Sequence, residues 1–328
     1  MRAALAEQLR GGVAPAVLTP LTADGRLVRA DLERYATAVA AQPIRGLAVW
    51  AHTGRGPYLA DADNDVVLAT FRAAAGELPL IAGVAPDRAA AEPDAVISSA
   101  LRRADRAVSG GADALMVFPP RPFAARPDRE RLLADLHEAI AARFDLPLLL
   151  FYLHAEAGGY DYSPALLRSL LAIPTVIGIK SATLNAAMTC QDVISLVHQE
   201  FPGKLAITGE DRMFGPSLMW GADAALVGIA SAAVAASTDL MATWARGDAS
   251  GFLEASSRLD RLAVATFCAP MEGYVQRMLW IAEREGLISP DGAHDPWAPP
   301  LPVGDRTAVL AAYDSCRPES ATGPGGAG

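Results

Sequence analysis

Short runs of apolar residues alternate along the chain with longer segments in which apolar positions recur every three to four residues. The runs are rich in valine, isoleucine and leucine, which is typical of parallel strands buried on both faces. The longer segments have the spacing of amphipathic helices. We predict strands at residues 13–18, 46–50, 78–84, 114–118, 146–152, 176–180, 204–208 and 224–229.

Eight strands separated by helices predict an α/β protein with a parallel sheet, and this number favours a (β/α)8 TIM barrel over an open sheet. The G-x-G-x-x-G pattern of dinucleotide-binding folds does not follow the first strand. We expect residues 1–11 to form an N-terminal extension and residues 12–234 the barrel. Residues 235–316 are predicted to form a C-terminal helical region, and the Gly- and Pro-rich residues 317–328 a disordered tail.

Composition narrows the classes of partner. The 328 residues are 52% hydrophobic, with a net charge of −9. This balance supports a large core and argues against nucleic acid or an anionic membrane as partner. No apolar stretch has the length of a membrane span, and Glu7 and Arg10 interrupt the N-terminal segment, so that no signal peptide is predicted. The three cysteines lack metal-ligand spacing, and we expect a cytoplasmic protein with reduced thiols, no metal and no cofactor.

Lys180 is the main candidate for chemistry, because it ends the apolar run at residues 176–180. Burial at that point would lower the pKa of the ammonium and yield a neutral amine that can attack a carbonyl to form a Schiff base. The alternative is a lysine at the rim of the sheet that reaches solvent.

Further candidates follow the ends of other predicted strands, where barrel proteins carry their working residues. His52, Thr53, Gly54 and Arg55 form a turn that can hold a carboxylate, although Arg55 could equally be a solvated cation. Tyr152 and His154 are two residues apart, which predicts that they share a face and could transfer protons. Two residues complete the predicted substrate-binding set: Gly209, which follows the predicted strand 204–208, and Ile229, which ends the predicted strand 224–229.

These residues resemble the dihydrodipicolinate synthase and N-acetylneuraminate lyase superfamily, whose members are class I Schiff-base lyases. The resemblance extends from about residue 12 to residue 287 and is carried by several motifs: Gly12-Val-Ala-Pro-Ala-Val-Leu-Thr-Pro20, Thr53-Gly54, Ile177-Gly-Ile-Lys180-Ser-Ala-Thr183 and Gly209-Glu-Asp211. Tyr152 precedes Lys180 by 28 residues (180 minus 152), a separation that is similar to that of the family's tyrosine and lysine.

The resemblance implies a (β/α)8 barrel with C-terminal helices that assembles as a homodimer or homotetramer. It implies that Lys180 forms an imine with a small 2-oxo acid such as pyruvate or a keto-deoxy sugar acid, and that Tyr152 moves protons. Thr53 and the neighbouring backbone N–H groups would hold the substrate carboxylate.

The chain departs from the family pattern at His52 and Arg55, and the loop at residues 118–123 has no tyrosine. His52 and His154 are therefore candidate replacements for the family's proton relay. The sequence leaves aldolase and dehydratase chemistry both open. A different class of function also stays open, namely a catalytically degenerate member that binds a keto acid or a partner without turnover.

Overall fold

A computed structural model describes residues 2–316, and its centre is a parallel sheet of seven strands that follow one another in chain order. Each strand is buried throughout its length, as the unbroken apolar runs predict. The strands are β1 (Leu47–Val49), β2 (Leu80–Val84), β3 (Ala114–Val117), β4 (Leu148–Leu153), β5 (Val176–Ala182), β6 (Leu205–Thr208) and β7 (Ala224–Ala225).

The prediction of eight strands is confirmed in part. The predicted first strand, residues 13–18, forms isolated bridges at Val13 and Ala16 instead of a continuous ladder. The interruption has a physical reason, because Pro15 has no N–H group to donate. The segment nevertheless bonds to both edges of the sheet: Ala14 N donates to Ala225 O at 2.8 Å, and Val17 N donates to Ala48 O at 3.0 Å.

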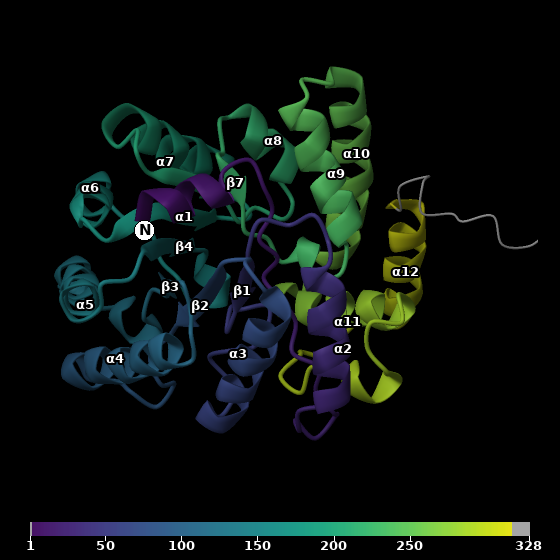
Figure 1. Cartoon of the computed structure of the whole chain (residues 1–328), viewed down its shortest axis with the longest axis horizontal. Coiled ribbons are helices and arrows are strands. Elements are labelled where there is room, and N and C mark those ends of the chain that lie inside the picture. The colour runs from purple at the N-terminus through teal and green to yellow at the C-terminus, as the bar shows by residue number, and fades with distance from the viewer. Residues whose placement is uncertain (1, 317–328) are drawn as a thin grey trace, which may run out of the picture.

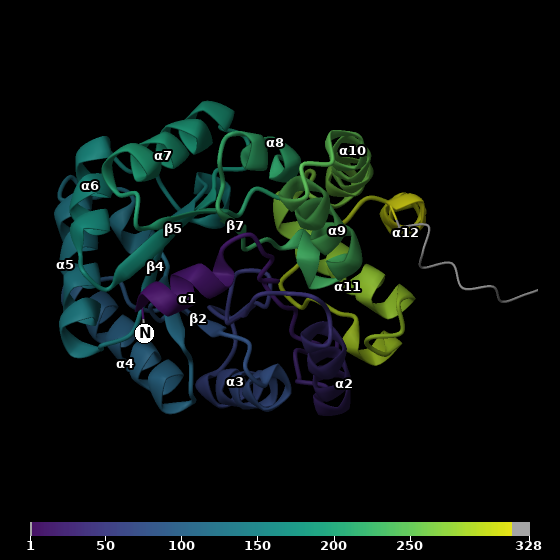
Figure 2. The same ribbon diagram turned by 45° about the horizontal axis from the view of Figure 1, so that its top comes forward.

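Helices surround the strands, and those from α3 to α8 form the outer layer around the sheet (Figures 1 and 2). Helices α9 to α12 follow β7 and gather with α2 on the other side of the molecule. The helices are α1 (Arg2–Leu9), α2 (Arg29–Ala40), α3 (Asp61–Ala75), α4 (Pro93–Ser109), α5 (Arg129–Arg143), α6 (Pro164–Ala172), α7 (Ala187–Glu200), α8 (Phe214–Met219), α9 (Val234–Ala245), α10 (Ala249–Thr266), α11 (Tyr274–Arg284) and α12 (Asp305–Cys316).

The apolar side chains form two clusters, one on each face of the sheet. Successive strand residues point to opposite faces. On β4, Leu150 and Tyr152 join the large cluster between sheet and helices, whereas Leu149, Phe151 and Leu153 join a smaller inner cluster. The face on which a strand residue lies therefore decides whether it can reach the interior.

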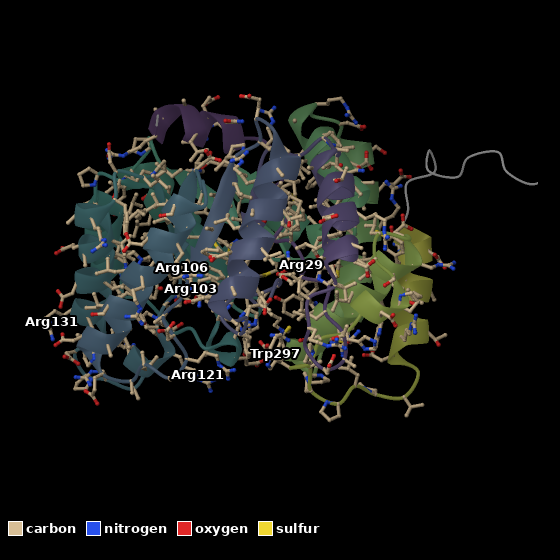
Figure 3. The ribbon with its side chains drawn as sticks, turned by 60° about the horizontal axis from the view of Figure 1, so that its bottom comes forward. Arg29, Arg103, Arg106, Arg121, Arg131 and Trp297 are labelled. Carbon is tan, nitrogen blue, oxygen red and sulfur yellow. The ribbon has the colours of Figure 1, made fainter. Side chains whose placement is uncertain are left out.

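The two ends of the sheet differ. Helix α1 packs Leu5 and Leu9 onto the inner cluster at the amino ends of the strands, where Gly11 N donates to Asp223 O just before β7. The carboxyl ends lie on the opposite side, which carries Arg121 and Trp297 in Figure 3, away from the purple α1 at the top. Within residues 2–316 no helix combines the length and apolar character needed to cross a membrane. The predicted tail, residues 317–328, lies outside the described residues.

Candidate active site

Lys180 lies near the carboxyl end of β5 with its side chain on the inner face of the sheet. The residue is 6% exposed, and its ammonium nitrogen lies 4.3 Å from the centre of the Phe151 ring. Gly209 makes room for this side chain, because a Cβ there would lie 2.5 Å from Lys180 Cε. The sequence also allowed a lysine at the rim of the sheet that reaches solvent. The burial of Lys180 contradicts that interpretation.

Burial changes the charge state that Lys180 and Asp211 prefer. Desolvation lowers the pKa of Lys180 below its ordinary value, and the negative charges of Asp211 and Glu210 oppose this effect. Burial likewise raises the pKa of Asp211 above its ordinary value, against the hydrogen bond from the Ile229 N–H and the charge of Lys180. Both directions favour a neutral amine, which is the form that attacks a carbonyl.

The structure does not bring Tyr152 to Lys180, and this corrects the predicted placement. Phe151 is the register partner of Lys180, whereas Tyr152 is the partner of Ser181 on the outer face. The Tyr152 ring lies 4.8 Å from that of Tyr162, and its hydroxyl donates to Asp161 at 3.1 Å. Burial raises its pKa to about 12. Tyr152 therefore belongs to the packing between sheet and helices.

The turn after β1 delivers two of the predicted residues to the Lys180 pocket. Thr53 and His52 line the pocket, and Thr53 Oγ1 lies 3.1 Å from the hydroxyl of Tyr274. Gly54 lies behind them: its carbonyl accepts a hydrogen bond from Thr19 Oγ1 at 2.7 Å, and a Cβ there would lie 2.7 Å from Val17 O. Gly54 thus allows the turn to pack closely without lining the pocket.

Arg55 is a buried, paired residue and not a solvated cation. Its side chain is 2% exposed, and its Nη2 donates to Asp295 Oδ2 at 2.6 Å while Nη1 donates to Glu272 Oε2 at 2.6 Å. Although burial works against the charged form, Asp295 holds the pKa of Arg55 above its ordinary value. Protein carboxylates occupy its guanidinium group, and the contact of Arg55 with substrate stays a prediction.

Glu272 connects this ion pair to His52. His52 Nε2 lies 2.9 Å from Glu272 Oε1. Burial would raise the pKa of Glu272, but the hydrogen bond and charge of His52, together with Arg55, lower it to about 2. Glu272 therefore remains a carboxylate that fixes the position of His52 at the rim of the pocket.

Three non-glycine residues with left-handed backbone stand at strand ends beside the site: Trp50, Arg55 and Leu184. Each such residue costs about 1–3 kcal/mol and persists only where its surroundings hold it. Here Trp50 Nε1 donates to Asn64 O at 2.7 Å, and Leu184 N donates to Glu210 Oε2 at 2.7 Å. The loops that shape the pocket are thus held in place by buried hydrogen bonds and by the ion pairs of Arg55.

Of the remaining predicted residues, some line the pocket and one holds a pocket residue in place. His154 and Gly209 line the pocket, although His154 and Tyr152 do not share a face as expected, because His154 follows the end of β4. Burial, with a contribution from His52, lowers the pKa of His154. Ile229 does not line the pocket; its N–H donates to Asp211 Oδ1 at 2.7 Å and so positions that carboxyl group.

Several pocket residues were missed by the sequence interpretation, and Tyr274 is the most informative of them. Tyr274 begins α11, 221 residues after Thr53, and its ring stacks on Phe267 with centroids 4.8 Å apart. Phe151, Asp211 and Phe267 line the pocket as well. No local pattern marks Tyr274 in the sequence, because only the folded chain brings α11 to the ends of the strands.

The Lys180 pocket opens toward a larger cavity. The inner pocket has a volume of about 30 Å³, and the outer cavity, which shares His52, Leu153 and Ala157 with it, of about 330 Å³. The outer cavity is also lined by Arg88 and Arg121. Residues 2–316 hold no group of three or more His, Cys, Asp and Glu residues placed to bind a metal ion.

A parallel sheet ringed by helices, with a cavity at the carboxyl ends of its strands, is the arrangement of TIM-barrel-like α/β enzymes. A family model for the dihydrodipicolinate synthetase family matches residues 9–303. The chain therefore belongs to the dihydrodipicolinate synthetase family, a family of Schiff-base, aldolase-type lyases.

Individual relatives agree with this assignment. The 4-hydroxy-tetrahydrodipicolinate synthase of Sodalis glossinidius is 27% identical over 301 residues, which cover 92% of this chain and 97% of that protein. The corresponding synthase of Xylella fastidiosa is 30% identical over 222 residues, or 67% of this chain and 68% of that protein. Among solved structures, the fold is similar to that of dihydrodipicolinate synthase from Thermotoga maritima, with a TM-score of 0.80, 19% identity, and coverage of 94% of this chain and 99% of that one. N-acetylneuraminate lyase from Mycoplasma synoviae has a TM-score of 0.76 at 19% identity, with coverage of 94% and 98%.

Proposed function

We propose that this protein is a Schiff-base-forming lyase, an aldolase or a dehydratase, which acts on a small 2-oxo acid through Lys180. The observation that carries the proposal is the burial of Lys180 at the end of β5, against the Phe151 ring and open to a cavity. In the same proposal, residues 12–17 close the seven-stranded sheet into a (β/α)8 barrel through their bonds to β7 and β1.

The chemistry begins with the neutral amine of Lys180. Its lone pair attacks the C2 carbonyl of the 2-oxo acid, and loss of water from the resulting carbinolamine yields a protonated imine. The imine acts as an electron sink. It accepts the electron pair released when a C–C bond breaks or when a proton leaves C3, and a β-hydroxyl can then depart from the enamine.

The substrate carboxylate is expected to lie at the turn after β1, where Thr53 lines the pocket and its hydroxyl can donate a hydrogen bond. The rest of the molecule would extend into the outer cavity. Arg88 and Arg121 line that cavity in a chain whose net charge is −9. Since guanidinium groups bind carboxylates strongly, we infer that the distal end of the substrate is anionic.

The test is borohydride trapping with pyruvate and with longer 2-oxo acids, read by intact-protein and peptide mass. The sequence contains two lysines, Lys180 and Lys204, and this supplies an internal control. Lys204 donates to the carbonyls of Ile173 and Val176, at the other end of β5, at 3.1 and 2.5 Å. We expect one adduct, mapped to Lys180 and lost in Lys180→Arg. An adduct on Lys204 alone, or none with any acid, would contradict the proposal and favour binding without turnover.

The family resemblance also leads us to expect a homodimer or homotetramer. Size-exclusion chromatography with light scattering on the full chain would distinguish a 34.2 kDa monomer from either assembly.

A further inference from the structure

Lyase chemistry at Lys180 needs a group that donates and accepts protons beside the imine carbon. Tyr152 does not supply it, because its side chain lies on the outer face of the sheet with Tyr162 and Asp161. The side chain that occupies the equivalent inner position is Phe151, which has no exchangeable proton. The proton-transfer group must therefore come from elsewhere in the pocket.

Tyr274 has the required placement. It lines the same pocket as Lys180, is 8% exposed, and its hydroxyl lies 3.1 Å from Thr53 Oγ1, where we place the substrate carboxylate. Gly228 leaves the space for this pair: a Cβ there would lie 3.1 Å from Thr53 Oγ1 and 3.3 Å from Tyr274 Cε2.

The surroundings of Tyr274 hold its ring rigidly. One neighbour is Phe267, with ring planes 24° apart, and the ring of His52 lies nearly parallel at 6.2 Å. Glu272, two residues earlier in the chain, is held by His52 and Arg55. These contacts hold the start of α11 against the turn that carries Thr53. The ion pairs of Glu272 thereby position Tyr274, and they have no other role in the chemistry proposed for Lys180.

We propose that Tyr274 is the catalytic proton-transfer residue of this protein, acting on the Lys180 adduct with Thr53 as its hydrogen-bond partner. The inference rests on the proposed function of Lys180. In the first step the C2–O bond of the carbinolamine breaks, the departing hydroxyl takes the proton of Tyr274 and leaves as water, and the nitrogen lone pair forms the C=N bond. In the second step the tyrosinate removes a proton from C3. That C–H electron pair forms the C2=C3 bond, and the C=N electron pair returns to nitrogen to give a neutral enamine and a protonated Tyr274.

The electrostatic environment agrees with the order of these steps. Burial raises the pKa of Tyr274 well above its ordinary value, with the charge of Arg55 acting in the opposite sense. The hydroxyl is therefore protonated at neutral pH and acts first as an acid. The tyrosinate formed beside a positively charged imine is a strong base for the short time that it exists.

The experiment compares three full-length variants with the wild-type protein, using pyruvate as the probe. Tyr274→Phe removes only the hydroxyl and keeps the stacked ring. Tyr152→Phe is the matched control, because it removes the hydroxyl of a buried tyrosine outside the pocket. His154→Ala tests the competing base within the pocket. Two quantities are measured for each: the borohydride adduct at Lys180 at equilibrium, and the rate of deuterium exchange at C3 of pyruvate in D2O by NMR.

We expect Tyr274→Phe to keep the adduct and to slow C3 exchange by about 10²-fold or more, the range typical of a lost general acid–base group. Tyr152→Phe should exchange within threefold of wild type. Unchanged exchange in Tyr274→Phe, loss of its adduct, or an equally slow Tyr152→Phe or His154→Ala would each overturn the inference. Absence of an adduct in the wild-type protein with pyruvate and with every longer 2-oxo acid would instead remove the proposed function on which the inference rests.

Discussion

Phe151 and Lys180 are register partners on β4 and β5, and the ammonium lies 4.3 Å from the centre of the aromatic ring. The face of a ring attracts a cation, whereas burial of the pair disfavours one. Burial lowers the pKa of Lys180, against the charges of Asp211 and Glu210. Phe151 thus forms an apolar wall beside the proposed nucleophile, in the place where a tyrosine was expected.

The charge of Asp211 leads to a prediction about pH. Imine formation requires the neutral amine, so trapping by borohydride should increase with pH and level off below the ordinary lysine pKa of about 10.4. Ionised Asp211 holds the pKa of Lys180 up, and Asp211→Asn removes that charge while keeping an oxygen for the Ile229 N–H. We expect the midpoint of the pH profile to move to lower pH in Asp211→Asn. A midpoint that stays in place or rises would contradict the described coupling.

The space beside Lys180 leads to a second prediction. In Gly209→Ala the new methyl group would lie 2.5 Å from Lys180 Cε and 2.9 Å from Ser181 O. The lysine side chain or the strand must move, and we expect the rate of adduct formation with pyruvate to fall by about tenfold or more, since small displacements of reacting groups are costly. Gly203→Ala is the matched control, because no atom lies within 4 Å of its added Cβ. Equal rates for the two variants would show that the pocket has more room than described.

The sequence predicted most of the fold for a clear physical reason. Strands buried on both faces are continuous apolar runs, and the helices between them have an amphipathic spacing that survives in a single sequence. The same logic located Lys180, the one charged residue at the end of such a run. It was less successful at the first strand, where Pro15 reduces the ladder to isolated bridges.

The pairing of Lys180 with an aromatic residue could not be predicted in the same way, because it depends on register. A 28-residue separation would pair Lys180 with Tyr152, and Leu148 does pair with Val176 at that separation. The register then shifts between Leu148 and Leu149, so that Lys180 pairs with Phe151 at a separation of 29 (180 minus 151). A shift of one residue moves every following side chain to the other face.

The sequence did not reveal the pocket position of Tyr274 or the buried ion pairs of Arg55, for a different reason. Their roles depend on contacts across more than 200 residues of chain: Thr53 with Tyr274 at a separation of 221, and Arg55 with Asp295 at 240. Such contacts leave no periodic signal in one sequence.

The ion pair of Arg55 leads to a prediction about stability. In Arg55→Met the side chain of Asp295, which is 0% exposed, would lose its partner. Breaking a buried pair in this way typically costs about 3–5 kcal/mol, because an uncompensated charge remains. Arg168→Met, at the exposed pair with Glu200, should leave the free energy of unfolding nearly unchanged, because solvent screens exposed ion pairs. Urea denaturation of both variants measures the difference, and a loss below about 1 kcal/mol in Arg55→Met would disprove the structural role.

The outer cavity leads to a prediction about substrate choice. If the distal end of the keto acid is anionic, replacing Arg88 and Arg121 together by glutamine removes two positively charged donors from the cavity that holds it. A hydrogen bond to a charged group contributes about 1.5–3 kcal/mol, so the KM for keto acids with a distal carboxylate should rise about tenfold or more. Pyruvate has no distal group and does not reach these arginines, and its trapping at Lys180 should be unchanged.

Arg168→Gln, at a surface arginine paired with Glu200, serves as the control for loss of positive charge. A parallel loss with pyruvate would mean that the double substitution disturbs the inner pocket. An unchanged KM for every dicarboxylic keto acid would mean that the substrate ends before it reaches the two arginines.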